Sequence, residues 1–471
     1  MNSPGEGELV ESGTFRVDTE KMLEVLSRYQ LQAPEYFIRA CIRCAVASGA
    51  SEVRLERASG APGTGFELGF DGRLFTKEEL SDVYAPLLAG SQDRGRHLAA
   101  GILALVKTAP SLLTISSGGA PVLIAGTAEP APEVYAPRTL LRALWRAEPR
   151  DLPLEKILDF PAESDAAIVC CPVAVRAPGG ESPPFKDIKP QEDSIAFEED
   201  GRRGFIFPAL DDGSTPVTDD IPEADSTVAL HVLGVYAETH TMRMSIAPVS
   251  ADFNDDSLSL DASFSKCVRN EQFDAALAFL EKQAEKLLLH EIKKQKEDLA
   301  AVGRFIRDIE LRELWRRRMM YLENWTDAVS PSWRDYLSAF GKWLGSREYG
   351  TTPKQYLPKP KGPARDCIFR TGPRTWWLQD ACRKALRTRK MELADIVPHP
   401  LWAAPVLLST KGKALSLADI NARVKMGRLS VSKYFSGEAI GSSEAVWLAS
   451  FRDELFLREC IPHYTWDEDF L

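Results

Sequence analysis

The sequence lacks several features that would place it in a common class of protein. No apolar run approaches the roughly 20 residues that a membrane-spanning helix needs, so we expect no membrane partner. Lys and Arg (58) are outnumbered by Asp and Glu (68), and the net charge of −10 argues against a nucleic-acid partner bound by phosphate neutralisation. The polar, acidic start, MNSPGEGELVES, does not have the pattern of a signal peptide, so we expect a cytoplasmic location.

Cysteine and histidine are also scarce. The eight cysteines have no regular spacing, which fits reduced thiols, and the six histidines are scattered. Cys41 and Cys44 lie three residues apart within an apolar helical pattern. A zinc site would need two more ligands nearby, and a thioredoxin-type pair would lie at the start of a helix. Small packing residues are the plainer interpretation of this pair, and we predict no metal site.

The length of 471 residues suffices for about two to four domains. Shifts in composition and periodicity predict the following segments: a disordered tail at 1–12, an α/β domain at 13–180, an acidic Pro- and Gly-rich connecting segment at 181–225, a middle domain with long helices at 226–350, a Pro- and Lys-rich linker at 351–366, and a divergent C-terminal domain at 367–471.

Local patterns also predict individual elements. Strands are expected at 14–18, 51–58, 65–72, 111–118, 121–126, 165–175 and 226–237. Helices are expected from Pro34, from Thr76 with Glu79 completing a capping box, and at 98–110, 271–325, 376–386 and 416–431.

This order of segments resembles the heat shock protein 90 family, within the GHKL ATPase superfamily. The resemblance rests on TFRVD at 14–18, FIRACIRCAVAS at 37–48 and LSLDASFS at 258–265, and it covers residues 13–285. It implies an α+β protein with a GHKL (Bergerat-type) α/β sandwich, a transducer-like αβ middle domain and a helical C-terminal region. In the family the C-terminal region dimerises, so a homodimer is a possible assembly.

The family's nucleotide pocket includes a helix with the pattern F-[IL]-R-E-x-x-x-N-A-x-D-A. Its Glu orients the attacking water and its Asn ligates magnesium. The resemblance places Ala40 at the Glu position, Cys44 at the Asn position and Ala47 at the following Asp position. The helix therefore keeps its pattern of apolar residues but lacks the groups that perform the chemistry.

The resemblance assigns five further residues to the same pocket. They are Phe70 where an adenine-binding Asp belongs, Gly72 of that turn, Gly95 and Gly101 of the phosphate loop, and Phe264 where an activating Arg belongs. A pocket lined by neutral or apolar groups disfavours a polyanion. We therefore predict a pseudo-ATPase with no catalytic residue and no bound cofactor, acting as a binding or assembly scaffold for other proteins.

Three alternatives stay open at this stage. In the first alternative, the chain is a working ATP-dependent chaperone that uses magnesium and substitute residues such as Asp71, Arg96 or His97. Otherwise the last segment carries the activity on an inert platform, or the element order belongs to an unrelated α+β fold.

Overall fold

The computed structural model describes the chain with gaps. The described residues are 36–60, 62–89, 93–126, 137–149, 153–160, 165–191, 193–209, 225–245, 247–308, 363–389, 400–409, 413–432, 445–448 and 451–461. The tail expected at 1–12, the strand expected at 14–18 and residues 351–362 of the expected linker lie outside them. Within these ranges, no helix combines the length and the apolar character needed to cross a membrane.

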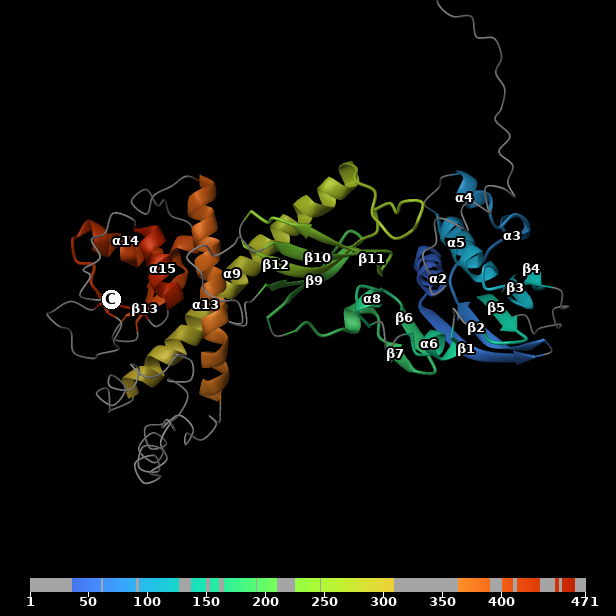
Figure 1. The fold of residues 1–471 in the computed structure, drawn as a ribbon, viewed down its shortest axis with the longest axis horizontal. Coiled ribbons are helices and arrows are strands. Elements are labelled where there is room, and N and C mark those ends of the chain that lie inside the picture. The colour runs from blue at the N-terminus through green and yellow to red at the C-terminus, as the bar shows by residue number, and fades with distance from the viewer. Residues whose placement is uncertain are drawn as a thin grey trace, which may run out of the picture.

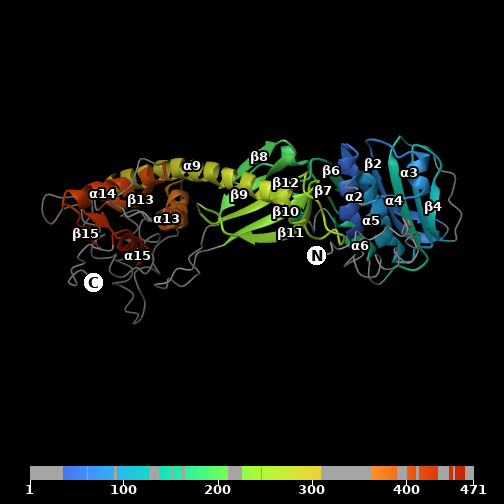
Figure 2. The same ribbon diagram turned by 90° about the horizontal axis from the view of Figure 1, so that it is seen from above.

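The described elements form three units that lie in a row (Figure 1, Figure 2). The first is built on a seven-stranded sheet, the second on a five-stranded sheet, and the third on a four-stranded sheet with helices. The protein is therefore α+β, as predicted from the sequence.

The first unit packs helices α2 and α5 together over its sheet (Figure 1). The strand order is β4-β3-β5-β2-β1-β6-β7, in which β1 and β6 are parallel and the other neighbours antiparallel. The elements are α2 (Tyr36–Ala47), β1 (Glu52–Gly60), β2 (Gly63–Phe70), α3 (Lys77–Ser81), α4 (Ala85–Ala89), α5 (Arg94–Val106), β3 (Leu112–Ser117), β4 (Val122–Gly126), β5 (Thr139–Trp145), α6 (Leu154–Leu158), α8 (Asp165–Ile168), β6 (Ala174–Ala177) and β7 (Gly180–Ser182).

The hairpin of β1 and β2 follows from alternation along the chain. Val53 and Leu55 are buried, and the residue between them is exposed. From β2, the ring of Phe66 stacks on Phe37 of α2 with ring centroids 4.8 Å apart. The strand pair predicted for this region is confirmed, and it provides the surface on which α2 lies.

The buried strand predicted at 165–175 is wrong over most of its length. Residues Asp165–Ile168 form the short helix α8, and β6 begins only at Ala174. Ile168 and Cys170 are both buried. Because a short apolar run that is buried on all sides has no diagnostic period, the sequence does not distinguish a strand from a helical turn here.

The second unit is a five-stranded sheet with the long helix α9 lying along it (Figure 1). The strand order is β11-β10-β12-β9-β8, in which β10 and β12 are parallel and the other neighbours antiparallel. The elements are η1 (Phe185–Asp187), β8 (Ile195–Glu199), β9 (Arg202–Pro208), β10 (Ser226–Val232), β11 (Val235–Met242), β12 (Val249–Asp255) and α9 (Glu271–Asp308).

The connecting segment predicted at 181–225 is wrong over residues 195–208. These residues form β8 and β9, and β9 pairs with β12 along its whole length. The abundant acidic residues conceal a short alternation in which Ile195 and Phe197 pack against the core while Glu198 is exposed. A strand at the edge of a sheet tolerates such charges because one of its faces contacts water.

The third unit surrounds a small sheet of order β14-β13-β16-β15 with helices, so the C-terminal region that the sequence predicts as helical also contains strands. Its strands are two to five residues long, which is too short for periodicity to reveal them. The elements are α13 (Pro363–Arg389), η4 (Pro400–Ala403), β13 (Pro405–Ser409), β14 (Ala414–Ser416), α14 (Leu417–Lys425), β15 (Val431–Ser432), β16 (Val446–Trp447) and α15 (Phe451–Cys460).

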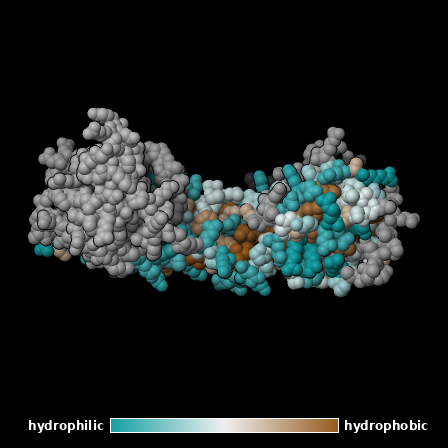
Figure 3. All heavy atoms as spheres, turned by 90° about the horizontal axis from the view of Figure 1, so that it is seen from below, coloured by the Kyte–Doolittle hydropathy of each residue, from teal (hydrophilic) through white to brown (hydrophobic). Residues whose placement is uncertain are grey.

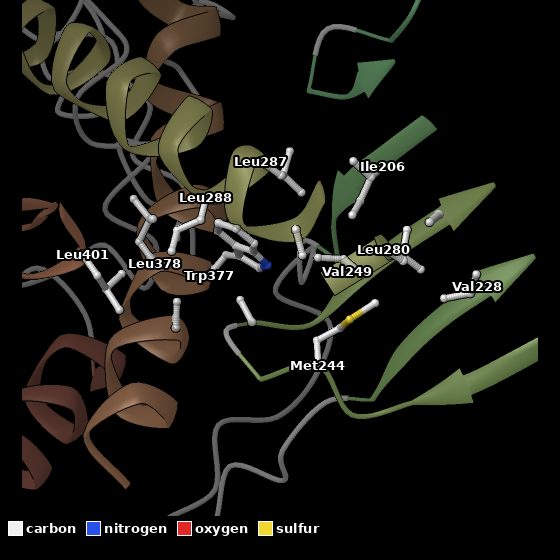
Figure 4. Close-up of a cluster of buried hydrophobic side chains, with 14 of the residues drawn as sticks. Ile206, Val228, Met244, Val249, Leu280, Leu287, Leu288, Trp377, Leu378 and Leu401 are labelled. Atoms are coloured by element: carbon white, nitrogen blue, oxygen red, sulfur yellow. The ribbon is translucent and has the colours of Figure 1, made fainter. Parts of the chain in front are cut away.

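The second and third units share one hydrophobic core (Figure 4). Leu280 and Leu288 of α9 and Trp377 of α13 belong to this core. The indole Nε1 of Trp377 donates a hydrogen bond of 2.6 Å to the carbonyl oxygen of Pro248. Apolar residues also gather in the middle of the row of units when the molecule is viewed from below (Figure 3). The boundary expected at residue 367 therefore does not separate two cores.

Candidate functional site

Helix α2 carries the first three positions that the sequence singled out. Ala40 and Cys44 are buried, whereas Ala47 is exposed at the C-terminal end of the helix. Ala40 belongs to the same buried cluster as Phe264, and Cys44 to the same cluster as Phe70. The structure thus brings these residues into the packed interior around α2, and Ala40 and Cys44 offer no carboxylate that could accept a proton.

The thiols of α2 are fully buried. Burial raises the pKa of Cys41 to about 12. Burial and the neighbouring Cys41 also raise the pKa of Cys44 well above its ordinary value. Because the thiolate is the form that binds metals and attacks disulfides, these protonated groups act here as small packing residues.

Gly95 and Gly101 both lie within helix α5, which begins at Arg94 and not at residue 98, so the assignment of Gly95 to a loop before the helix is wrong. A methyl group on Gly101 would lie 3.0 Å from the Sγ atom of Cys41 and 3.5 Å from the Cβ atom of Ala40. A methyl group on Gly95 would lie 2.9 Å from the Cγ atom of Pro86. Both glycines therefore allow α5 to approach its neighbouring helices closely.

The turn after β2 places Phe70 in the core and Asp71 at the surface. The carboxylate of Asp71 accepts hydrogen bonds from the backbone N–H groups of Ser51 (2.7 Å) and Glu52 (3.1 Å). Partial burial raises the pKa of Asp71, but the hydrogen bonds from these two residues outweigh it and lower the pKa below its ordinary value. Gly72 has a φ of +96°, which favours glycine. Asp71 is therefore engaged in holding the turn to the start of β1.

Phe264 reaches the first unit from the second. It follows β12 in a loop, has a φ of +57°, and is only 6 % exposed. The guanidinium carbon of Arg96 lies 4.8 Å from the centroid of its ring, and the ring of His97 meets it edge-on at 6.2 Å. Phe264 thus places an aromatic ring against α5.

Arg43 is a buried charged residue that the sequence analysis did not single out. It is 1 % exposed in the middle of α2, and its guanidinium donates to four carbonyl oxygens. These acceptors are Val232 (3.3 Å), Val235 (3.3 Å), Tyr236 (2.8 Å) and Phe264 (3.3 Å), all in the second unit. The signal in the sequence was an arginine between the apolar residues Ile42 and Cys44, on a helix whose only other charged residue is Arg39. A buried arginine needs several acceptors.

Two polar side chains of α5 remain unsatisfied next to Phe264. Arg96 Nη1 and His97 Nδ1 are buried and have no hydrogen-bond partner among the described residues. Burial, and then the charges of Arg43 and Arg96, lower the pKa of His97 to about 3, so its imidazole is neutral. Burial also lowers the pKa of Arg96, against the opposing effect of Asp261 and Asp93.

Comparison with known proteins gives no assignment: no protein-family model matches the chain, and no curated protein is significantly similar to it. In the part of the chain that the structure describes, no group of three or more His, Cys, Asp or Glu side chains is placed to hold a metal ion. The physical properties of the site therefore carry the functional argument.

Proposed function

We propose that the chain is a catalytically inactive relative of the heat shock protein 90 family that acts as a protein-binding or assembly scaffold. The observation that supports this most directly is the position of Phe264, whose buried ring covers Arg96 and shares a cluster with Ala40. In the proposal, this is the region in which an active relative would hold the terminal phosphates of ATP.

The replacements in this region weigh against catalysis. Loss of a positioned general base costs about 10²–10⁴ in rate. Loss of a charged hydrogen bond to the adenine costs about 1.5–3 kcal/mol of binding free energy. In the proposal, Ala40 stands at the position of the general base and Phe70 at the position of the adenine-binding Asp, so both contributions are lost. Phe264 stands at the position of the activating Arg. Several such losses together leave neither tight binding nor turnover.

The arrangement of elements supports the proposed relationship. Helices α2 and α5 pack over a mixed sheet, and a second mixed sheet with a long helix follows in the chain. This order agrees with a GHKL-type sandwich followed by a transducer-like middle domain. The scaffold acts on other proteins and assembles as a homodimer through its third unit.

An ATP-dependent chaperone is the second candidate. The Nη1 of Arg96 favours it, because a buried donor that has no partner among the described residues can receive a phosphate. Asp71, the substitute adenine anchor, contributes less because its carboxylate already binds Ser51 and Glu52.

Isothermal titration of the full chain with ATP and magnesium, combined with a phosphate-release assay, tests the choice. The scaffold proposal predicts neither micromolar binding nor turnover. Micromolar binding with turnover that is lost in Arg96→Met, but kept in Arg57→Met, would establish the chaperone instead. Arg57 is the matched control because it is exposed on the first unit and pairs with Glu155.

The scaffold role itself has a separate test. Light scattering after size-exclusion chromatography of the complex purified from its own organism should give a mass well above 52.2 kDa, with a second protein in fixed stoichiometry. Elution of the chain alone as a 52.2 kDa monomer would refute it.

A further inference from the structure

Buried groups cross the joint between the first and second units in both directions. From the first unit, the guanidinium of Arg43 donates to the carbonyl oxygens of Val232, Val235, Tyr236 and Phe264. These acceptors belong to two separate segments, the β10–β11 hairpin and the loop after β12. A single planar group with several fixed donors therefore ties α2 to two parts of the second unit.

From the second unit, Arg203 and Val235 reach back. Arg203 of β9 is 5 % exposed, and its Nε donates to the carbonyl oxygen of Cys170 at 2.9 Å. Val235, at the start of β11, is fully buried within the core cluster of the first unit. Apolar burial and directed hydrogen bonds thus act on the same joint.

The turn of the β10–β11 hairpin fits against the first unit without spare room. Leu233 and Gly234 have φ values of +52° and +79°, as a tight two-residue turn requires. A methyl group on Gly234 would lie 2.6 Å from the Cα atom of Cys171 and 2.7 Å from the Cδ atom of Pro172. The Gly234 N–H also donates to the Oδ1 atom of Asn254 at 2.6 Å.

We propose that these groups form a lock that fixes the first and second units in a single arrangement. Opening the joint would expose the apolar side chain of Val235 to water and would exchange the four carbonyl acceptors of Arg43 for water, and both changes favour the closed arrangement. A partner that contacts both units therefore binds a surface whose arrangement is already fixed, so its binding does not include the entropic cost of ordering the two units. This last consequence rests on the proposed scaffold function, whereas the lock itself does not.

Double electron–electron resonance measures the lock in the full chain. Spin labels are attached through an azide-bearing amino acid at Glu56 in β1 and at Ala278 in α9, both of which are exposed. The wild type should give one narrow distance peak. Gly234→Ala should broaden that peak or add a second one, because its methyl group meets backbone of the first unit. A broad wild-type distribution would overturn the proposal.

Gly201→Ala is the matched control for the turn. Gly201 has a φ of +78° in the β8–β9 turn, but a methyl group there meets nothing closer than 3.4 Å. It therefore carries the same backbone strain without the clash, and its distance peak should stay narrow. Equal broadening in Gly201→Ala and Gly234→Ala would refute the role of the hairpin contact.

Arg43→Met tests the other half of the lock, with Arg57→Met as the control for lost charge. Arg43→Met should broaden the peak, while hydrogen exchange within β1 and β2 stays slow because the first unit remains folded. An unchanged peak in Arg43→Met would refute the role assigned to this arginine. No nucleotide is present in these distance measurements. A separate finding of ATP binding would therefore contradict the scaffold function but would not bear on the lock.

Discussion

Replacing Phe264 separates two properties that the structure combines at one position, a buried ring and a left-handed backbone. Phe264→Ala removes the ring and keeps the strained φ of +57°. Phe264→Gly removes the ring and relieves the strain. Neither change removes the backbone carbonyl oxygen that accepts a hydrogen bond from Arg43.

The magnitudes follow from burial and φ. Truncating a buried Phe to Ala costs about 3–5 kcal/mol of unfolding free energy. A left-handed backbone costs a residue with a Cβ atom roughly 1–2 kcal/mol, whereas glycine loses about 0.4–1 kcal/mol through the extra freedom of its unfolded chain. Phe264→Gly should therefore be less destabilised than Phe264→Ala by about 1 kcal/mol, which reverses the usual order of these two residues.

Urea unfolding followed by circular dichroism measures this difference, provided that the slopes of the transitions stay equal. Phe279→Ala and Phe279→Gly supply the comparison, because Phe279 lies within helix α9 and there glycine should be the worse choice. If Phe264→Gly is at least as destabilised as Phe264→Ala, the backbone argument is wrong. If both variants lose less than about 1 kcal/mol, the ring is not the packed group described above.

Three further predictions address the same region. Folding lowers the pKa of His97 from 6.5 to about 3, so its contribution to stability is complete above pH 6.5 and is lost as the pH falls towards 3, by at most about 1.4 kcal/mol per pH unit. His97→Leu should therefore flatten the measured dependence of the unfolding free energy on pH, and an unchanged slope would contradict this. Gly72→Ala should lower the thermal unfolding temperature more than Gly49→Ala does. Both positions have a positive φ, but only at Gly72 would the methyl group lie 2.7 Å from a backbone oxygen, that of Ser48. Equal shifts in the unfolding temperature would show that φ alone is the cause. Seven cysteines are buried: Cys41, Cys44, Cys170, Cys171, Cys267, Cys382 and Cys460. Their reaction with a thiol-specific disulfide reagent at pH 8 should require unfolding, and rapid modification of any of these seven in the native protein, read by mass spectrometry, would contradict their burial.

Local signals in the sequence determined the elements that depend on near neighbours. The capping box is one case: the side chain of Thr76 accepts from the Glu79 N–H at 3.2 Å, and the carboxylate of Glu79 accepts from the Thr76 N–H at 2.7 Å. The β1–β2 hairpin and helix α9 are others. Each is encoded by residues a few positions apart, through alternation, helical spacing or a cap, so a reading of the chain alone finds it.

Only the tertiary structure decided how distant segments meet. The pairing of β9 with β12 and the insertion of Val235 into the first unit join residues far apart in sequence, and no local pattern marks them. Arg43 illustrates the reason most clearly. Its charge on an apolar helix is tolerated because carbonyl oxygens from positions 232–264 converge on it, and that convergence exists only once the two units have folded against each other.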